Sequence, residues 1–187
     1  MGLRIISGDL KGKTLFSPKG TRIRPTADRL RESIFSILSA RVAGSVVLDL
    51  FAGTGALGIE ALSRGASFAL FVDNDKEALS IIKKNIEICG LSDRIKIAGL
   101  NIERNFIDFR HEFPVVNLVF IDPPYNKNLI RPALVNLSGS RILEKEALLV
   151  IEHDLLETIP EDIPGYKIED KRRYGKTLVS FIKYMVC

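Results

Sequence analysis

An acid, two prolines and an aromatic residue follow the apolar run VVNLVFI, in the order Asp122, Pro123, Pro124 and Tyr125. Proline cannot donate to a strand ladder, so a buried strand must end here and continue as a stiff loop. An exocyclic amine on a nucleobase is a poor nucleophile, and a carboxylate and a backbone carbonyl that accept its N–H groups would orient it. The ring of Tyr125 offers a face on which a splayed-out base can stack, a role that needs no hydroxyl. These four residues are the candidate catalytic group.

A glycine turn lies earlier in the chain, within DLFAGTGALGIEAL. Gly53, Gly55 and Gly58 satisfy the spacing GxGxxG, and Asp73 comes twenty residues after Gly53, at the end of the next apolar run. This spacing is typical of a dinucleotide site, in which a helix N-terminus meets a pyrophosphate and an acid holds the ribose hydroxyls. A lone match of this kind is a weak signal.

Asp49 argues against a dinucleotide. It ends the first apolar run, four residues before the turn, so its carboxylate should face the same crevice as the turn. A doubly negative pyrophosphate would be unfavourable there, whereas S-adenosylmethionine carries an ammonium and a sulfonium and has no phosphate. The sign of the charge favours S-adenosylmethionine as the cofactor. The alternative is that Asp49 only caps the glycine turn.

Alternating apolar runs and amphipathic segments must position these residues, which predicts an α/β fold with a mostly parallel sheet. The expected strands are 45–51, 68–73, 94–99, 115–122 and 146–154, and the expected helices are 24–38, 56–65, 76–89, a weaker one around 102–110, and 130–139. The tail has two extended stretches joined around Tyr174 and Gly175, which predicts an antiparallel C-terminal hairpin. Residues 1–23 are expected to form a small β-hairpin extension, followed by one domain over 24–187.

The composition is that of an ordinary globular protein: 187 residues, 46% hydrophobic and 27% charged. No apolar run approaches the ~20 residues that span a bilayer, and the N-terminus has no signal-peptide core, so a cytoplasmic location without a membrane partner is expected. The two cysteines lack metal-site spacing, and no metal is expected.

The net charge of +4 is unevenly distributed. Residues 1–41 hold nine Lys and Arg against three acids. A second basic cluster, KRRYGK, occupies 171–176. Basic segments at both ends of the chain favour a nucleic-acid partner, although solvated surface faces would look the same. The candidate RNA-binding residues are Lys11, Lys13, Lys19, Arg22 and Arg24.

Taken together, these motifs resemble one family. DLFAGTGALG, an acid ending the second strand, and DPPY look like class I (Rossmann-like) methyltransferases that act on exocyclic amines. RIISGDLKGKTL, RPTADRLRESIFSIL and YGKTLVSFIKY narrow the resemblance to the RsmD family, the small-subunit (16S) ribosomal RNA guanine-N2 methyltransferases of bacteria. That family often has Phe where Tyr125 stands. The likeness covers nearly the whole chain.

The resemblance implies roles for individual residues. Asp49, Phe51, Ala52, Gly53, Thr54 and Gly55 would line the methionine and ribose part of S-adenosylmethionine. Asp73 would hold the ribose hydroxyls, Asn74 and Asn101 would lie at the adenine, and the loop from Asp122 to Tyr125 would hold the target guanine. The segment from Arg24 to Arg31 would pack near the cofactor and the incoming RNA. The substrate would be ribosomal RNA, either free or within a small-subunit assembly intermediate, and the enzyme a monomer.

Two other functions stay open at this point. Similar proline loops serve enzymes that methylate adenine N6 in DNA or RNA, or a glutamine amide. A non-catalytic RNA-binding or nucleotide-binding module is the more distant alternative. The basic N-terminus favours nucleic acid over protein, and the lack of an added target-recognition domain disfavours a sequence-specific DNA enzyme.

Overall fold

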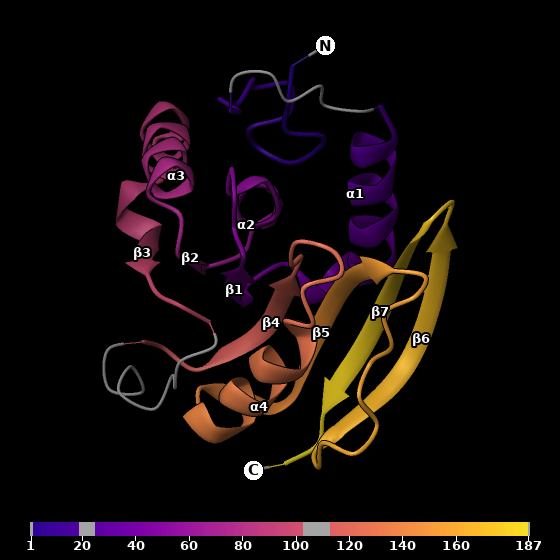
Figure 1. Cartoon of the computed structure of the whole chain (residues 1–187). Coiled ribbons are helices and arrows are strands. Elements are labelled where there is room, and N and C mark those ends of the chain that lie inside the picture. Colours follow the sequence, from indigo (N-terminus) through magenta and orange to yellow (C-terminus); the bar gives the residue numbers. More distant parts are fainter. Residues whose placement is uncertain (1, 19–24, 103–112, 187) are drawn as a thin grey trace. The chain divides into compact units, whose positions relative to one another are not determined.

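The computed structural model describes residues 2–18, 25–102 and 113–186, and its ribbon is drawn in Figure 1. The chain forms two compact units, residues 1–99 and 100–187. The predicted helix around 102–110 falls almost wholly outside the described residues. The predicted boundary between residues 23 and 24 also falls outside them and stays a prediction.

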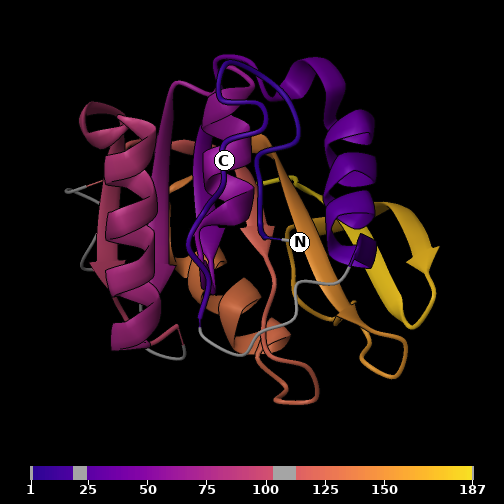
Figure 2. The same ribbon diagram turned by 90° about the horizontal axis from the view of Figure 1, so that it is seen from above.

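The N-terminal unit alternates helices and parallel strands. Its elements are α1 (Pro25–Leu38), β1 (Val46–Leu50), α2 (Ala56–Ser63), β2 (Phe68–Asp73), α3 (Lys76–Cys89) and β3 (Ile95–Gly99), with short 3-10 turns at Ser39–Arg41 and Ser92–Arg94. The strand order is β3-β2-β1, and both pairings are parallel. Figure 2 shows α2 and α3 side by side on the same face of these strands. The glycine turn and Asp73 therefore follow the carboxyl ends of neighbouring strands.

Helix α3 shows why the local prediction succeeds. Asp75 caps its start by accepting from the backbone N–H groups of Glu77 and Ala78, and Gly90 ends it in the left-handed conformation at φ 66°. The apolar stripe that includes Ile82 and Ile86 is buried. Both bounds match the sequence prediction, because the capping residue, the apolar stripe and the terminal glycine all indicate the same helix.

The N-terminal segment, residues 2–18, is folded onto the N-terminal unit. A backbone hydrogen bond joins Leu15 to Leu3, and another joins Gly12 to Ile5, around a single antiparallel bridge between Arg4 and Thr14. This is a hairpin-like turn with one bridge and no ladder. Leu3, Ile5 and Leu15 are buried, so the segment contributes to the core of the unit.

The C-terminal unit contains β4 (Val116–Ile121), α4 (Ile130–Ser140), β5 (Leu143–Asp154), β6 (Tyr166–Tyr174) and β7 (Thr177–Tyr184). Its strand order is β4-β5-β7-β6. β4 and β5 are parallel, whereas β7 is antiparallel to both β5 and β6. The register pairs Tyr174 with Thr177 across the final turn, which confirms the predicted C-terminal hairpin. β5 begins earlier than predicted and passes through Glu146 at φ 68°, an irregularity that apolar periodicity could not reveal.

The core is aliphatic and aromatic. Val47 and Leu48 of β1, Phe71 of β2 and Phe120 of β4 are inaccessible to solvent. The expected fold class is confirmed: an α/β fold with seven strands, mostly parallel, and an antiparallel C-terminal hairpin. Among the described residues, no helix has the length and apolar character needed to cross a membrane.

Candidate active site

The predicted cofactor residues gather at the carboxyl ends of β1 and β2 in the N-terminal unit. The backbone takes the left-handed conformation at three alternate residues there, Phe51 (φ 60°), Gly53 (φ 55°) and Gly55 (φ 76°). For a bulky residue such as Phe51 this conformation is costly and persists only where the surroundings impose it. The surrounding structure therefore imposes this backbone conformation. A turn of this kind can expose backbone N–H and C=O groups to a ligand.

Asp73 fixes this turn from the end of β2. Its Oδ2 accepts from the backbone N–H of Gly53 at 2.8 Å, and its Oδ1 accepts from that of Asp75 at 2.9 Å. An ionised carboxylate has about four acceptor sites, so each oxygen keeps one for a further donor. The residue is therefore suited to accept from the two hydroxyls of a ribose.

The side chain of Asp49, a residue of β1, contacts the first turn of α2. Its Oδ2 accepts from the backbone N–H of Gly58 at 2.9 Å, and the side chain is buried. The pKa of Asp49 is raised to about 7, mainly by burial and to a smaller extent by the nearby Asp73, against the lowering effect of the Gly58 hydrogen bond. The capping role that the sequence left as the alternative is present, and a direct role toward a cofactor stays a prediction.

The same contact bears on the choice of cofactor. A dinucleotide site needs free N–H groups at the helix N-terminus for its pyrophosphate. In this chain one of those groups, on Gly58, is taken by a carboxylate. Gly58 itself leaves no room for a side chain, since a Cβ there would lie 2.4 Å from a ring carbon of Phe71. This glycine therefore serves helix–strand packing, as the third glycine of a dinucleotide turn also does, so only the contact with Asp49 bears on the cofactor.

The site fits S-adenosylmethionine better. On the Cβ side of Gly53 the nearest atom is the Phe51 carbonyl oxygen at 3.9 Å, so a ligand can approach the turn closely. Ala52 is buried, whereas Asn74 at the end of β2 is exposed, as expected of a residue beside an adenine. Thr54 is held through its carbonyl, which accepts from the amide of Asn85 at 2.9 Å. Asn101, also exposed, belongs to the C-terminal unit.

The predicted catalytic residues form one loop after β4 in the C-terminal unit. Asp122 is exposed, Pro123 is buried, and Pro124 and Tyr125 are exposed again. The buried proline lies between the two residues of interest, Asp122 and Tyr125, which are both accessible to solvent. The role of this loop as a preorganised acceptor stays a prediction, and we call residues 122–125 the acceptor loop.

The hydroxyl of Tyr125 has partners that the sequence did not suggest. It donates to Oε1 of Glu152 on β5 at 2.8 Å and lies 3.1 Å from Oγ1 of Thr177 on β7. Burial raises the pKa of Tyr125, and burial also raises that of Glu152. Next to it, the backbone N–H of Asn126 donates to Glu157 at 3.1 Å. The loop is thus tied to the two strands beside it, while Tyr125 as a whole residue stays 39% exposed.

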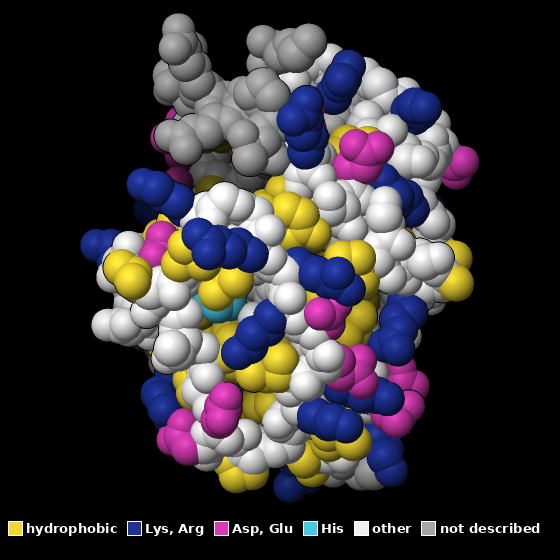
Figure 3. Space-filling view, turned by 90° about the vertical axis from the view of Figure 1, so that its right-hand side faces the viewer, with side chains coloured by type: hydrophobic (Ala, Val, Ile, Leu, Met, Phe, Trp, Pro, Cys, Tyr) yellow, Lys and Arg dark blue, Asp and Glu magenta, His cyan; other side chains and the backbone are white. Residues whose placement is uncertain are grey.

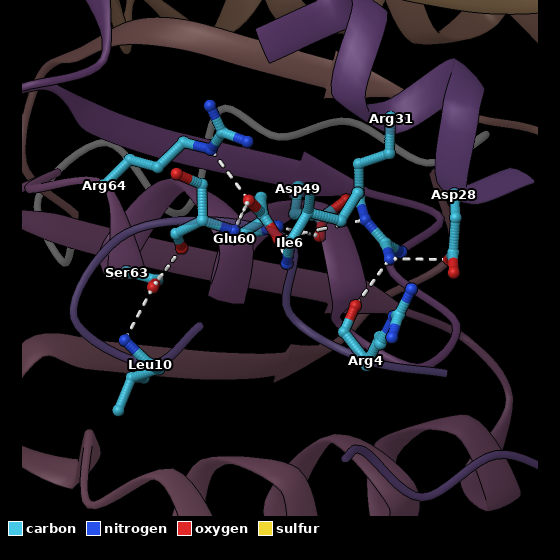
Figure 4. Close-up of polar contacts among 11 residues, drawn as sticks. Arg4, Ile6, Leu10, Asp28, Arg31, Asp49, Glu60, Ser63 and Arg64 are labelled. Carbon is cyan, nitrogen blue, oxygen red and sulfur yellow. Dashed lines mark hydrogen bonds and ion pairs between the residues drawn. The ribbon is translucent and has the colours of Figure 1, made fainter. Parts of the chain in front are cut away.

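The N-terminal segment, which carries the candidate RNA-binding lysines, is held by a buried acid. Glu60 of α2 accepts from the backbone N–H groups of Ile6 and Ser7 at 2.8 and 3.0 Å (Figure 4). Arg64 donates to the same carboxylate at 2.7 Å. Lys11 and Lys13 remain exposed. Lys19, Arg22 and Arg24 lie outside the described residues.

Arg31, from the segment expected to lie near cofactor and RNA, is buried in this cluster. It donates to the carbonyl of Arg4 at 2.7 Å and to Asp28 at 3.0 Å, and its Nε lies 3.9 Å from Glu60 (Figure 4). These contacts assign Arg31 a structural role, joining α1 to the N-terminal segment.

Two further residues have structural roles. The side chain of His153 is buried between the carbonyls of Asp154 and Glu157 on one side and the Ser180 hydroxyl on the other. Buried Asn85 binds both backbone groups of Phe16 as well as the Thr54 carbonyl, so it links the N-terminal segment to the glycine turn.

Four residues with these contacts were not predicted from the sequence: Asn85, Glu60, Glu152 and Thr177. Each acts over a long sequence separation that no local pattern reports. The described residues contain no group of three or more metal-ligating side chains.

Comparison with known proteins extends over nearly the whole chain. A family model described as Conserved hypothetical protein 95 matches residues 3–183. Ribosomal RNA small subunit methyltransferase D of Escherichia coli K12 is 32% identical over 176 residues, 93% of this chain and 86% of that protein. The Bacillus subtilis protein YlbH is 35% identical over 181 residues, 97% of this chain and 98% of that protein.

Solved structures agree with these relatives. The Escherichia coli protein yhhF superposes with a TM-score of 0.84 at 26% identity, covering 99% of each chain. The hypothetical protein TTHA0928 of Thermus thermophilus gives a TM-score of 0.78 at 28% identity, covering 98% of this chain and 99% of that one. The likeness therefore spans both units.

Proposed function

Since the chain belongs to the RsmD family, the family of the matched model and of its curated relatives, we propose that it methylates the exocyclic N2 amine of a guanine in 16S ribosomal RNA, with S-adenosylmethionine as methyl donor. The observation that carries this proposal is the acceptor loop. It presents Asp122 and the face of Tyr125 together, on a loop in which Pro123 is buried. The carboxylate can accept a hydrogen bond from the exocyclic amine of a base, and the ring can stack on that base.

The N-terminal unit would hold the cofactor. S-adenosylmethionine supplies an electrophilic methyl group on a sulfonium. Asp73 would accept from both ribose hydroxyls with the acceptor sites that Gly53 and Asp75 leave open. The left-handed turn at Phe51, Gly53 and Gly55 would receive the methionine part, and the exposed Asn74 would lie along the adenine.

The acceptor loop would act on the base amine. Asp122 and a backbone carbonyl of the loop would accept the two N–H groups of N2, which turns the nitrogen lone pair toward the methyl group. As the new N–C bond forms, the C–S bond breaks and its electron pair stays on sulfur. The amine then releases one proton, to Asp122 or to solvent. The side chain contributes orientation and charge, and no covalent intermediate is needed.

Two features support RNA over the other acceptors. Several curated relatives that share most of this chain are named as ribosomal RNA methyltransferases, among them the Escherichia coli protein. Lys11 and Lys13 are exposed on a segment that Glu60 fixes in place, so they are presented rigidly to a polyanion. We infer that they contact RNA phosphates. The proposed enzyme acts as a soluble monomer in the cytoplasm, on free RNA or on an assembly intermediate.

A substrate-class experiment tests this proposal. The purified protein would be given tritiated S-adenosylmethionine with unmethylated 16S ribosomal RNA, with unmethylated DNA of similar length, or with a glutamine-containing peptide. Only the RNA should become labelled. Label in the DNA or the peptide would replace the proposal with one of the alternative amine acceptors. No label in any of the three, nor in an unmethylated small-subunit assembly intermediate, would leave only a binding module.

A further inference from the structure

The turn between β6 and β7 has a charge pattern unlike the rest of its hairpin. The first half of β6 mixes signs, with Lys167, Glu169 and Asp170 close together. Residues 171–176 then carry four cations and no acid. We call this stretch the basic turn; its cations are Lys171, Arg172, Arg173 and Lys176.

Part of this charge is available to a partner. Arg172 pairs with Asp170 at 2.7 Å, and Arg173 donates to the carbonyl of Gly175 at 3.0 Å. Lys171 and Lys176 are exposed, and within the described part of the chain no ion pair engages either ammonium group. Figure 3 shows dark blue Lys and Arg side chains interspersed with magenta Asp and Glu side chains on the face that it draws.

The basic turn lies next to the acceptor loop. Thr177, the residue after the turn, has its hydroxyl oxygen 3.1 Å from the hydroxyl oxygen of Tyr125. The carbonyl of Lys176 accepts from the backbone N–H of Leu155 at 3.3 Å, which holds the turn against the end of β5. Three acids at or just after the end of β5 bind other groups and, among the described residues, form no ion pair with the turn: Glu152 accepts from Tyr125, Asp154 from Leu156 and Glu157 from Asn126. The turn's positive charge is therefore presented beside the residues that would hold the target base.

We propose that the basic turn binds the phosphates of the RNA that directly flank the target nucleotide. This inference rests on the proposed function, because it takes the acceptor loop as the place where the base is held. A nucleotide turned out of its strand keeps its flanking phosphates close to the pocket that receives the base. Lys176, one residue from Thr177, which contacts Tyr125, is placed to hold those phosphates.

Protection of an exposed sheet edge is the simpler explanation for lysines on an edge strand. That role spreads charge along the strand, since every unpaired backbone group needs cover. Here the cations are concentrated in one turn, and the earlier half of the same edge strand carries acids as well. The concentration beside the acceptor loop favours RNA as the partner.

Measuring RNA affinity at several salt concentrations tests whether the basic turn binds phosphates. Lys171 and Lys176 would both be replaced by Ala, and binding to unmethylated 16S ribosomal RNA measured across a range of salt without cofactor. The slope of log affinity against log salt should fall by about 0.7 to 0.9 for each phosphate that is no longer bound. The matched control is Lys83→Ala with Lys84→Ala, two exposed lysines on α3, which should leave affinity and slope unchanged. An affinity and slope equal to wild type in the Lys171 and Lys176 variant would overturn the proposal.

Crosslinking tests the position. A photo-crosslinker would be attached to Lys176→Cys in a background with Cys187→Ser, leaving Cys89 as a buried thiol. Crosslinks should map within a few nucleotides of the methylated guanine. Crosslinks far from that guanine, or none above those of a Lys83→Cys control, would contradict the proposal.

The two experiments separate failure of this inference from failure of the proposed function. If wild type methylates ribosomal RNA and the variants bind it normally, the basic turn is not an RNA surface and the function stands. If the variants lose RNA affinity but wild type transfers no methyl group to the RNA, the surface stands and the proposed reaction is wrong.

Discussion

The carboxylate of Asp73 accepts a hydrogen bond from the backbone N–H of Gly53, with 2.8 Å between oxygen and nitrogen. This contact joins the end of β2 to the glycine turn after β1, two elements that carry different parts of the proposed cofactor site. It also shows that Asp73 has a role before any ligand binds. Loss of Asp73 should therefore affect both the shape of the turn and the ribose contacts.

Asp73→Ala should weaken S-adenosylmethionine binding by about 1–3 kcal/mol, since it removes the acceptor for two hydroxyls and frees the turn. Isothermal titration calorimetry measures this directly. The control is Asp75→Ala, which removes a carboxylate two residues away. It should lower the free energy of unfolding by about 1 kcal/mol, because the helix cap is removed, and leave cofactor affinity intact. Equal affinities for wild type and Asp73→Ala would refute the ribose assignment.

Asp49 should make the stability of the protein depend on pH. Its pKa is raised from 3.8 to about 7 by burial, so the folded state holds a proton that the unfolded state releases. This contribution is full below about pH 4 and is lost as the pH rises through 7, with a slope of at most about 1.4 kcal/mol per pH unit. Urea unfolding between pH 5 and 8 should show wild type losing stability relative to Asp49→Asn, which can still accept from Gly58. A pH-independent difference between the two would mean that Asp49 is ionised throughout.

Asp122→Ala should leave cofactor affinity nearly unchanged and lower the single-turnover rate of methyl transfer on the order of a hundredfold or more, as for loss of one preorganised electrostatic group. Asp162→Ala is the control, because it removes an exposed carboxylate of the same unit that pairs with Arg131. That variant should react at the wild-type rate. A comparable rate for Asp122→Ala would remove this residue from the reaction.

Changes at Tyr125 should separate the ring from the hydroxyl. Tyr125→Phe keeps the stacking face and loses the bonds to Glu152 and Thr177, so RNA affinity should hold while the single-turnover rate falls about tenfold through a looser loop. Tyr125→Ala should also weaken RNA binding, by about 1–3 kcal/mol of lost stacking. The sequence alone predicts that Tyr125→Phe reacts as fast as wild type, because stacking needs no hydroxyl. That result would show that the hydroxyl bonds do not position the loop.

Local sequence patterns predicted most of the fold. Within each element, the capping residues, the apolar periodicity and the turn residues indicate the same bounds. α3 and β2 match their predicted bounds. Contacts between distant segments could not be predicted. Glu60 sits in the apolar helix GIEAL, where nothing in the sequence indicates that its carboxylate is buried and binds Ile6, Ser7 and Arg64. The hydroxyl partners of Tyr125 are likewise 27 and 52 residues away along the chain.

The candidate site was predictable in kind and less so in detail. Residue types and spacing identified the glycine turn, Asp73 and the acceptor loop. From the sequence we favoured Asp49 as a carboxylate that faces the cofactor, with capping as the alternative, and the folded chain buries it against the first turn of α2. Whether a carboxylate faces a ligand or a backbone N–H depends on angles within a turn, and spacing alone does not fix them.

The identity of the methylated nucleoside tests the central claim most directly. Unmethylated 16S ribosomal RNA would be incubated with the protein and S-adenosylmethionine carrying a tritiated methyl group, digested to nucleosides and separated. The account predicts that the label elutes with N2-methylguanosine and is absent when Asp122→Ala replaces wild type over the same short reaction time. Label in N6-methyladenosine, or in any nucleoside methylated elsewhere than on the guanine amine, would contradict it.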